Sequence, residues 1–163
     1  MITIMTKLIS YYESPIGELA LVGDEDKLVI LGWAGEDMPE DAILCAGGQE
    51  TPVLLRTKQQ LDEYFAGTRR EFDLPLAPAG TEFQRKVWDA LCTIPWGETR
   101  SYGEIATQVG NPKGSRAVGG ANNRNPIAVV IPCHRVIGSS GKMVGYRGGL
   151  GIKEHLLKLE GII

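Results

Sequence analysis

The sequence has few of the residues that build disulfide scaffolds and metal centres. Its 163 residues include three cysteines and two histidines. No two cysteines have the CxxC spacing that zinc sites use. An odd number of widely separated cysteines also argues against a disulfide framework. We therefore expect free thiols, no bound metal and no cofactor.

Long apolar runs are missing as well. No segment approaches the ~18 consecutive apolar residues of a membrane-spanning helix. Residues 1–7 lack the charged, apolar and small-residue series of a signal peptide. The hydrophobic content of 43% is ordinary for a globular protein and sufficient to build a core. These features predict a cytoplasmic protein.

Acidic residues are absent from a long stretch of the second half. Residues 105–153 contain seven Lys or Arg and no Asp or Glu, while the rest of the chain carries all twenty acidic residues. A basic surface attracts phosphate, and the acidic remainder would limit indiscriminate binding. Such segregation also arises by chance on a solvated surface, and charge alone does not decide between the two.

The first part of the chain has the pattern of a small sheet. Three short apolar-rich segments, 7–13, 18–23 and 27–32, are separated by turn-forming residues and predict an antiparallel meander. Residues 51–65 have the periodicity of a helix. Residues 71–76 predict a further strand.

A segment rich in Pro and Gly, residues 75–80, is the candidate linker between two domains. After it, two capping boxes predict helix starts, one at Thr81 and one at Ser101. The second box begins a helix over 102–109. A turn at 111–114 and a short helix over 115–123 complete an arrangement that resembles a helix-turn-helix. A generic helical hairpin is the alternative interpretation.

We therefore predict an α+β fold in two domains. Residues 1–78 form a small α/β domain on an antiparallel sheet. Residues 79–163 form a mostly helical domain that contains the helix-turn-helix.

The pair Cys133-His134 is the main candidate for chemistry. It follows Pro132, which fixes the local backbone and removes a competing donor. A thiol becomes nucleophilic as the thiolate, and an imidazole can accept its proton directly or through water. A carboxylate elsewhere can orient that imidazole. For the dipeptide alone, a structural cysteine beside a surface histidine is the alternative.

The surrounding sequence decides between these interpretations. The segment 132–136, Pro-Cys-His-Arg-Val, closely resembles the active-site signature of the methylated-DNA–protein-cysteine methyltransferases, the O6-alkylguanine-DNA alkyltransferases. Residues 7–78 fit the family only loosely. Further motifs match in order at 83–88, 94–97, 101–106, 114–121, 125–126, 131–137, 145–149 and 153–161.

The resemblance implies direct-reversal DNA repair, with residues 1–78 as a support domain and residues 79–163 as the catalytic and DNA-binding domain. An alkyl group passes from O6-alkylguanine, with O4-alkylthymine as a second candidate substrate, irreversibly to Cys133. The thioether product has no acyl group for water to attack, so each chain acts once. The implied partner is double-stranded DNA bound through its minor groove, and we expect a monomer with no obligate protein partner.

The resemblance also assigns roles in the chemistry. Cys133 is the acceptor, His134 is the base acting through a water, and Glu160 is the carboxylate that orients His134. Asn125 braces the active-site turn. Tyr102 assists nucleotide rotation and donates a proton to the departing guanine.

Further residues are implied around the base and the DNA. The backbone around Cys133 and Val136 accepts from the guanine amine. Tyr146 lines the pocket, and the Arg147 amide points at the guanine oxygen. Some relatives have a small residue at position 147 and an apolar one at 122, which leaves the pocket width and one groove contact open. Arg116 is the finger that fills the vacated stack. The predicted DNA-contacting residues are Lys113, Ser115, Arg116, Asn122, Asn123, Arg124 and Arg135.

Two other classes of function compete with this one. A Cys-His hydrolase would use the same pair but would need an oxyanion arrangement and would turn over. A helix-turn-helix module that binds DNA without chemistry explains the basic segment but not Pro132-Cys133-His134.

Overall fold

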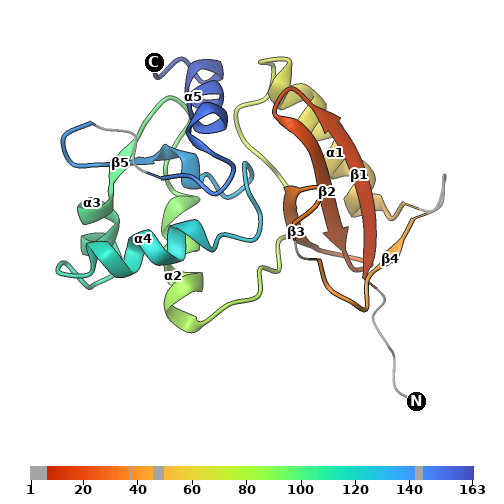
Figure 1. Cartoon of the computed structure of the whole chain (residues 1–163), viewed down its shortest axis with the longest axis horizontal. Helices are drawn as coiled ribbons and strands as arrows, with labels where there is room; N and C mark the ends of the chain where they lie inside the picture. The colour runs from red at the N-terminus through yellow and green to blue at the C-terminus, as the bar shows by residue number, and fades with distance from the viewer. Residues whose placement is uncertain (1–6, 37, 46–49, 142–144) are drawn as a thin grey trace. The chain divides into compact units, whose positions relative to one another are not determined.

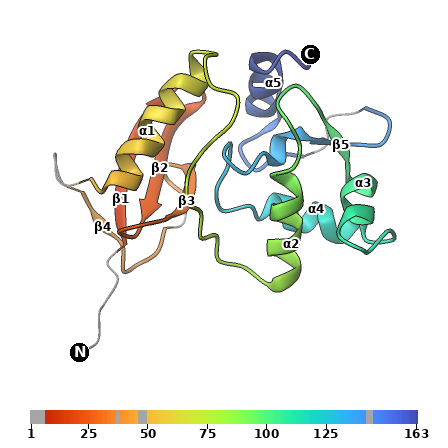
Figure 2. The ribbon, with the colours of Figure 1, turned by 180° about the vertical axis from the view of Figure 1, so that it is seen from behind.

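The computed structural model describes residues 7–36, 38–45, 50–141 and 145–163. The chain divides into two compact units, Met1–Pro78 and Ala79–Ile163 (Figures 1 and 2). Among the residues described, no helix is both long and apolar enough to cross a membrane.

A four-stranded sheet forms the centre of the first unit. Its strand order is β3-β2-β1-β4. Strands β1 (Leu8–Ser14), β2 (Gly17–Gly23) and β3 (Leu28–Trp33) pair in antiparallel fashion. This confirms the predicted meander. Strand β4 (Ile43–Leu44) pairs with β1 in parallel and was not predicted, because two residues are too few for a periodic signal.

Helix α1 (Pro52–Phe65) covers one face of this sheet (Figure 2). The predicted helix over 51–65 is therefore confirmed, with Thr51 as its N-cap residue. Its apolar side chains fill the core of the unit because they recur at helical spacing on the face toward the strands. The buried residues include Leu54, Leu61 and Tyr64 from the helix and Leu19, Leu21 and Leu31 from the sheet.

The predicted strand over residues 71–76 is wrong. Only an isolated bridge joins Leu76 to Leu28. Pro75 has no N–H to donate to a ladder. The backbone of Asp73 instead bonds the Gln60 side chain of α1, through its carbonyl at 3.0 Å and its amide at 2.9 Å. The Gln60 side-chain amide thus makes the two backbone hydrogen bonds that a neighbouring strand would otherwise make.

The second unit is mostly helical, as expected. Helices α2, α3 and α4 pack against one another (Figure 1). Trp88 of α2 donates from its indole N–H to the Ala121 carbonyl at 2.9 Å. The elements are α2 (Glu82–Leu91), β5 (Arg100–Ser101), α3 (Tyr102–Gln108), α4 (Ser115–Asn123), the 3-10 helix η1 (Cys133–Arg135), β6 (Val136–Ile137) and α5 (Leu150–Leu159).

Both predicted capping boxes are present. Thr81 accepts from the Gln84 amide while the Gln84 side chain accepts from Thr81, and Ser101 and Glu104 are paired in the same way. These reciprocal bonds satisfy donors that a helix start would otherwise leave open. They fix where α2 and α3 begin.

Helices α3 and α4 are joined by a tight turn, as predicted. The Gly114 amide donates to the Asn111 carbonyl at 2.8 Å. A Cβ at Gly114 would lie 2.3 Å from the side-chain nitrogen of Asn111 and 3.0 Å from its carbonyl oxygen, so Asn111 would have to shift. Gly119 of α4 faces the Tyr102 ring, and a Cβ at Gly119 would touch that ring at 3.8 Å.

Candidate active site

A buried turn between α4 and η1 leads to Cys133. Asn125 ties the turn together, since its Nδ2 donates to the Ile131 carbonyl at 2.8 Å and its Oδ1 accepts from the Ile127 amide at 3.0 Å. Val129 inside the turn has a φ of +70°, which is unfavourable for a β-branched residue. A residue stays in such a conformation only where the structure packed around it holds it there. Asn125 makes these contacts in the turn that it was predicted to brace.

The Cys133 thiol is buried, with 6% of the residue exposed. Burial raises the pKa of this thiol. Hydrogen bonding from Asn125 and Tyr146 and the positive charges of Arg147 and Lys153 act in the opposite direction. The net effect is a raised pKa, so the thiol needs a base to become a nucleophile near neutral pH.

His134 and Glu160 form a buried hydrogen-bonded pair, 2.6 Å from Nε2 to Oε2. Burial lowers the pKa of His134, although Glu160 raises it, and the net shift is downward. The imidazole is therefore neutral near pH 7. Because Nε2 donates to the carboxylate, Nδ1 carries the lone pair. In the described part of the chain Nδ1 has no hydrogen-bond partner, so it is available to accept a proton.

Arg135 binds the other side of the same carboxylate. Its Nε donates to Glu160 Oε1 at 2.6 Å, its Nη2 to Oε2 at 3.1 Å, and its Nη1 to the Ile94 carbonyl at 2.7 Å. A guanidinium in this two-pronged geometry fixes a carboxylate strongly. The buried position of Arg135 contradicts the prediction that it contacts DNA. Its role is to hold Glu160 in place.

Asn122 is also buried, which contradicts its predicted groove contact. Its side-chain amide donates to the Cys133 carbonyl at 3.3 Å. The residue lies on the inner face of α4 with Val118 and Ala121. A polar side chain in that position links the helix to the turn that carries the thiol.

Lys153 is a site residue that sequence reasoning missed. Its ammonium is fully buried and donates to the Val136 carbonyl at 2.7 Å. Burial lowers the pKa of Lys153, and Cys133 raises it, which indicates that the ammonium and the sulfur interact. A sequence signal existed, because Lys153 shares the inner face of α5 with Leu156, Leu157 and Glu160.

Two tyrosines lie near the thiol. Strand β5 pairs with β6 so that Ser101 is opposite Ile137, and this places Tyr102 beside the segment that follows η1. Burial and the nearby Cys133 raise the pKa of Tyr102, so its hydroxyl stays protonated and can donate. Tyr146 is half-buried, and its side chain acts to lower the pKa of the Cys133 thiol.

The other predicted DNA-contacting residues are exposed. Arg116 and Asn123 are exposed on α4, with Gly120 between them at helical spacing, and Arg124 follows at its C-cap. Lys113 and Ser115 are exposed at the start of the helix. Lys142, which belongs to the basic stretch of the sequence, lies outside the described residues.

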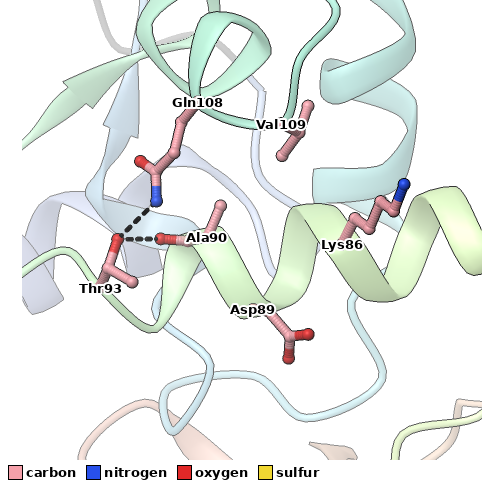
Figure 3. Close-up of a pocket in the computed structure, with 6 residues that line it drawn as sticks. All are labelled: Lys86, Asp89, Ala90, Thr93, Gln108 and Val109. Carbon is pink, nitrogen blue, oxygen red and sulfur yellow. Dashed lines mark hydrogen bonds between the residues drawn. The ribbon is translucent and has the colours of Figure 1, made fainter.

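A separate surface pocket lies between the end of α2 and α3 (Figure 3). Gln108 donates to the Thr93 hydroxyl at 3.0 Å, and Thr93 donates to the Ala90 carbonyl at 2.6 Å. None of the predicted site residues lines this pocket, so it is not the pocket of the predicted reaction. Its lining residues are Lys86, Asp89, Ala90, Thr93, Gln108 and Val109.

Comparison with known families accounts for both units of the chain. Residues 82–162 match the family model of the 6-O-methylguanine DNA methyltransferase, DNA binding domain. Residues 7–78 match that of the 6-O-methylguanine DNA methyltransferase, ribonuclease-like domain. The chain belongs to the 6-O-methylguanine DNA methyltransferase family. The resemblance found in the sequence is confirmed, and it extends to residues 7–78, where the sequence motifs were weak.

Individual members of this family are similar to this chain over nearly their whole length. A methylated-DNA–protein-cysteine methyltransferase of Methanosarcina acetivorans is 53% identical over 154 residues, which cover 92% of this chain and 96% of that relative. The constitutive enzyme of Bacillus subtilis is 48% identical over 159 residues, or 94% and 96% of the two chains. The crystal structure of Mycobacterium tuberculosis OGT in complex with DNA has 47% identity and a TM-score of 0.87, covering 94% of this chain and 92% of that one.

Proposed function

We propose that this protein repairs DNA by direct reversal, moving the alkyl group of O6-alkylguanine onto the sulfur of Cys133 in a single turnover. One observation carries the proposal. The buried thiol lies next in sequence to a neutral imidazole whose other nitrogen is bonded to a buried carboxylate. The names of the relatives, methylated-DNA–protein-cysteine methyltransferases, support the same chemistry.

The proton of the thiol passes to His134. Nδ1 accepts it, directly or through a water, and the imidazolium that forms is stabilised by the Glu160 carboxylate at Nε2. Arg135 keeps that carboxylate from rotating away. The buried Lys153 ammonium favours the thiolate that is left behind.

The thiolate then displaces guanine at the alkyl carbon. A sulfur–carbon bond forms, the carbon–oxygen bond breaks, and the electron pair goes to the guanine. Tyr102 donates its hydroxyl proton to the departing base and regains a proton that originated on the thiol. The products are unmodified guanine and a thioether on Cys133, which offers water no leaving group.

The protein binds DNA, as the similar Mycobacterium tuberculosis OGT does in its crystal structure with DNA. We infer that α4 enters the minor groove, since Arg116, Asn123 and Arg124 are exposed and Gly120, which lies between Arg116 and Asn123, leaves room for close approach. Cys133 is too buried to reach a base inside a duplex. The damaged nucleotide is therefore rotated out, and Arg116 fills the space it leaves.

The two units have different tasks in this proposal. Residues 79–163 carry out the chemistry and bind DNA, and residues 1–78 support them. Activity on O4-alkylthymine, a monomeric state and a cytoplasmic location stay predictions.

Peptide mapping tests this proposal. After reaction with an oligonucleotide containing O6-methylguanine, mass spectrometry should locate one methyl group on the peptide containing Cys133. Cys45 and Cys92 should be unmodified. A methyl group on either of those cysteines would contradict the assignment of the acceptor.

A further inference from the structure

Arg147 occupies a defined turn at the start of α5. The Gly149 amide donates to the Tyr146 carbonyl at 2.9 Å, and the Lys153 amide donates to the Gly149 carbonyl at 3.2 Å. Gly145 and Gly149 flank the turn with φ values of +39° and +99°, a region that favours glycine. The position of Arg147 is thus fixed relative to the helix that carries Glu160.

The side chain of Arg147 connects this turn to the segment that leads to the thiol. Its Nη1 donates to the Asn125 carbonyl at 2.7 Å. Asn125 is the residue whose side chain braces the turn before Cys133. Arg147 therefore joins two segments that are 22 residues apart in the sequence.

Both ends of this connection lie at the sulfur. The Asn125 side chain at one end, and Tyr146 and the charge of Arg147 at the other, all act to lower the pKa of the Cys133 thiol. The thiol is nearly inaccessible, with Cys133 6% exposed. A base carrying an alkyl group has to reach the sulfur past these groups.

We propose that Arg147 is a strap across the entrance to Cys133 and sets the size limit for the alkyl group that the protein accepts. This inference rests on the proposed function and names the substrates of the same site. Under this proposal a methyl group is accepted with the strap closed. A bulky neutral group such as benzyl requires the bond between Arg147 and Asn125 to break without replacement, since an apolar ring cannot accept from the guanidinium.

The test compares the full-length protein with three variants. Arg147→Ala removes the strap, and Arg147→Lys keeps the charge but lacks the planar fork. Arg56→Ala is the matched control, because Arg56 is an exposed arginine of the first unit that pairs with Asp73. Rates of Cys133 modification are measured by intact mass with identical oligonucleotides that contain O6-methylguanine or O6-benzylguanine.

The ratio of the benzyl rate to the methyl rate is the readout. We expect Arg147→Ala to raise this ratio at least tenfold, Arg147→Lys to raise it less, and Arg56→Ala to keep the wild-type ratio. A ratio unchanged in Arg147→Ala would overturn the strap. So would an equal fall in both rates, because that result means that Arg147 acts through its charge on the thiol and not through its size.

A second measurement without DNA separates the strap from the proposed function. Iodoacetamide and the bulkier N-phenyl iodoacetamide react with the thiol directly, and any change in the thiol pKa affects both rates alike. The rate of Cys133 modification by the bulky reagent, divided by the rate with the small reagent, should rise in Arg147→Ala. An unchanged ratio would reject the strap, whereas a wild-type protein that takes no methyl group from DNA would reject the proposed function alone.

Discussion

His134 and Glu160 lie 2.6 Å apart, from Nε2 to Oε2, and both side chains are fully buried. The two residues are separated by 26 positions in the sequence and come from η1 and the C-cap of α5. Arg135, next to His134, binds the same carboxylate at 2.6 Å. The end of α5 is thereby attached to the segment that carries the thiol, so the orientation of the base depends on where α5 ends.

Loss of this carboxylate should slow alkyl transfer. In Glu160→Gln the imidazolium loses its anionic partner, and we expect a decrease in rate on the order of a hundredfold, which is typical of an impaired general base. Affinity for DNA should stay near the wild-type value. The measurement is a pH–rate profile of single-turnover transfer.

Glu154→Gln is the matched control on the same helix, since Glu154 pairs with Lys158 on the outer face of α5. Its profile should coincide with that of the wild type. A Glu160→Gln profile that coincides with the wild type as well would remove Glu160 from the reaction.

Lys153→Met should shift the pH dependence of transfer to higher pH. Removal of the ammonium takes away a charge that lowers the pKa of Cys133, so the thiolate forms at higher pH. Folding stability should fall by at most about 1–3 kcal/mol, because the Val136 carbonyl loses its donor while a buried charge is removed. Arg at this position keeps the charge and serves as the comparison.

The readouts are the pH dependence of iodoacetamide modification at Cys133 and the thermal unfolding midpoint. A lower midpoint with an unchanged pH dependence in Lys153→Met would show that Lys153 acts on folding alone.

Arg116→Ala should impair repair of duplex DNA more than reaction with the free modified base. The side chain is exposed on α4, and a residue that fills a vacated stack matters only where a stack has to be opened. We expect a rate loss of about tenfold or more on duplex, consistent with an unstacking cost of a few kcal/mol. Equal losses on both substrates would indicate a structural role for Arg116.

Acid should destabilise the protein through His134. Burial lowers the pKa of His134 in the folded state below its ordinary value of 6.5. The unfolded chain therefore binds a proton more readily, and the free energy of unfolding falls as the pH drops below about 6.5. Denaturant unfolding between pH 5 and pH 8 measures this slope. It should be shallower in His134→Asn, and an equal slope in both proteins would exclude His134 as its source.

Much of the fold was predictable because it is set by local sequence. The capping boxes at Thr81 and Ser101 and the turn at Gly114 depend on residues a few positions apart, and all three were found. Strand β4 and the segment 71–76 depend on pairing with distant residues, and local residue patterns carry no reliable signal of such pairing.

The site was predictable in its chemistry and less so in the directions of its side chains. The motif around Cys133 identified His134 and, through the family resemblance, Glu160. Arg135 belongs to the basic stretch and Asn122 to the predicted recognition helix, and both were predicted to contact DNA. Both point inward instead, since the Glu160 carboxylate and the Cys133 carbonyl are buried and need donors.

The stoichiometry of alkyl transfer tests the central claim most directly. With O6-methylguanine oligonucleotide in large excess, product should rise to one equivalent per active chain and then stop. The plateau should scale with protein concentration, and Cys133→Ser should form no product, because a hydroxyl does not ionise as the thiol does. Continued product formation far beyond one equivalent per chain would contradict irreversible transfer to Cys133 and would indicate a Cys-His hydrolase.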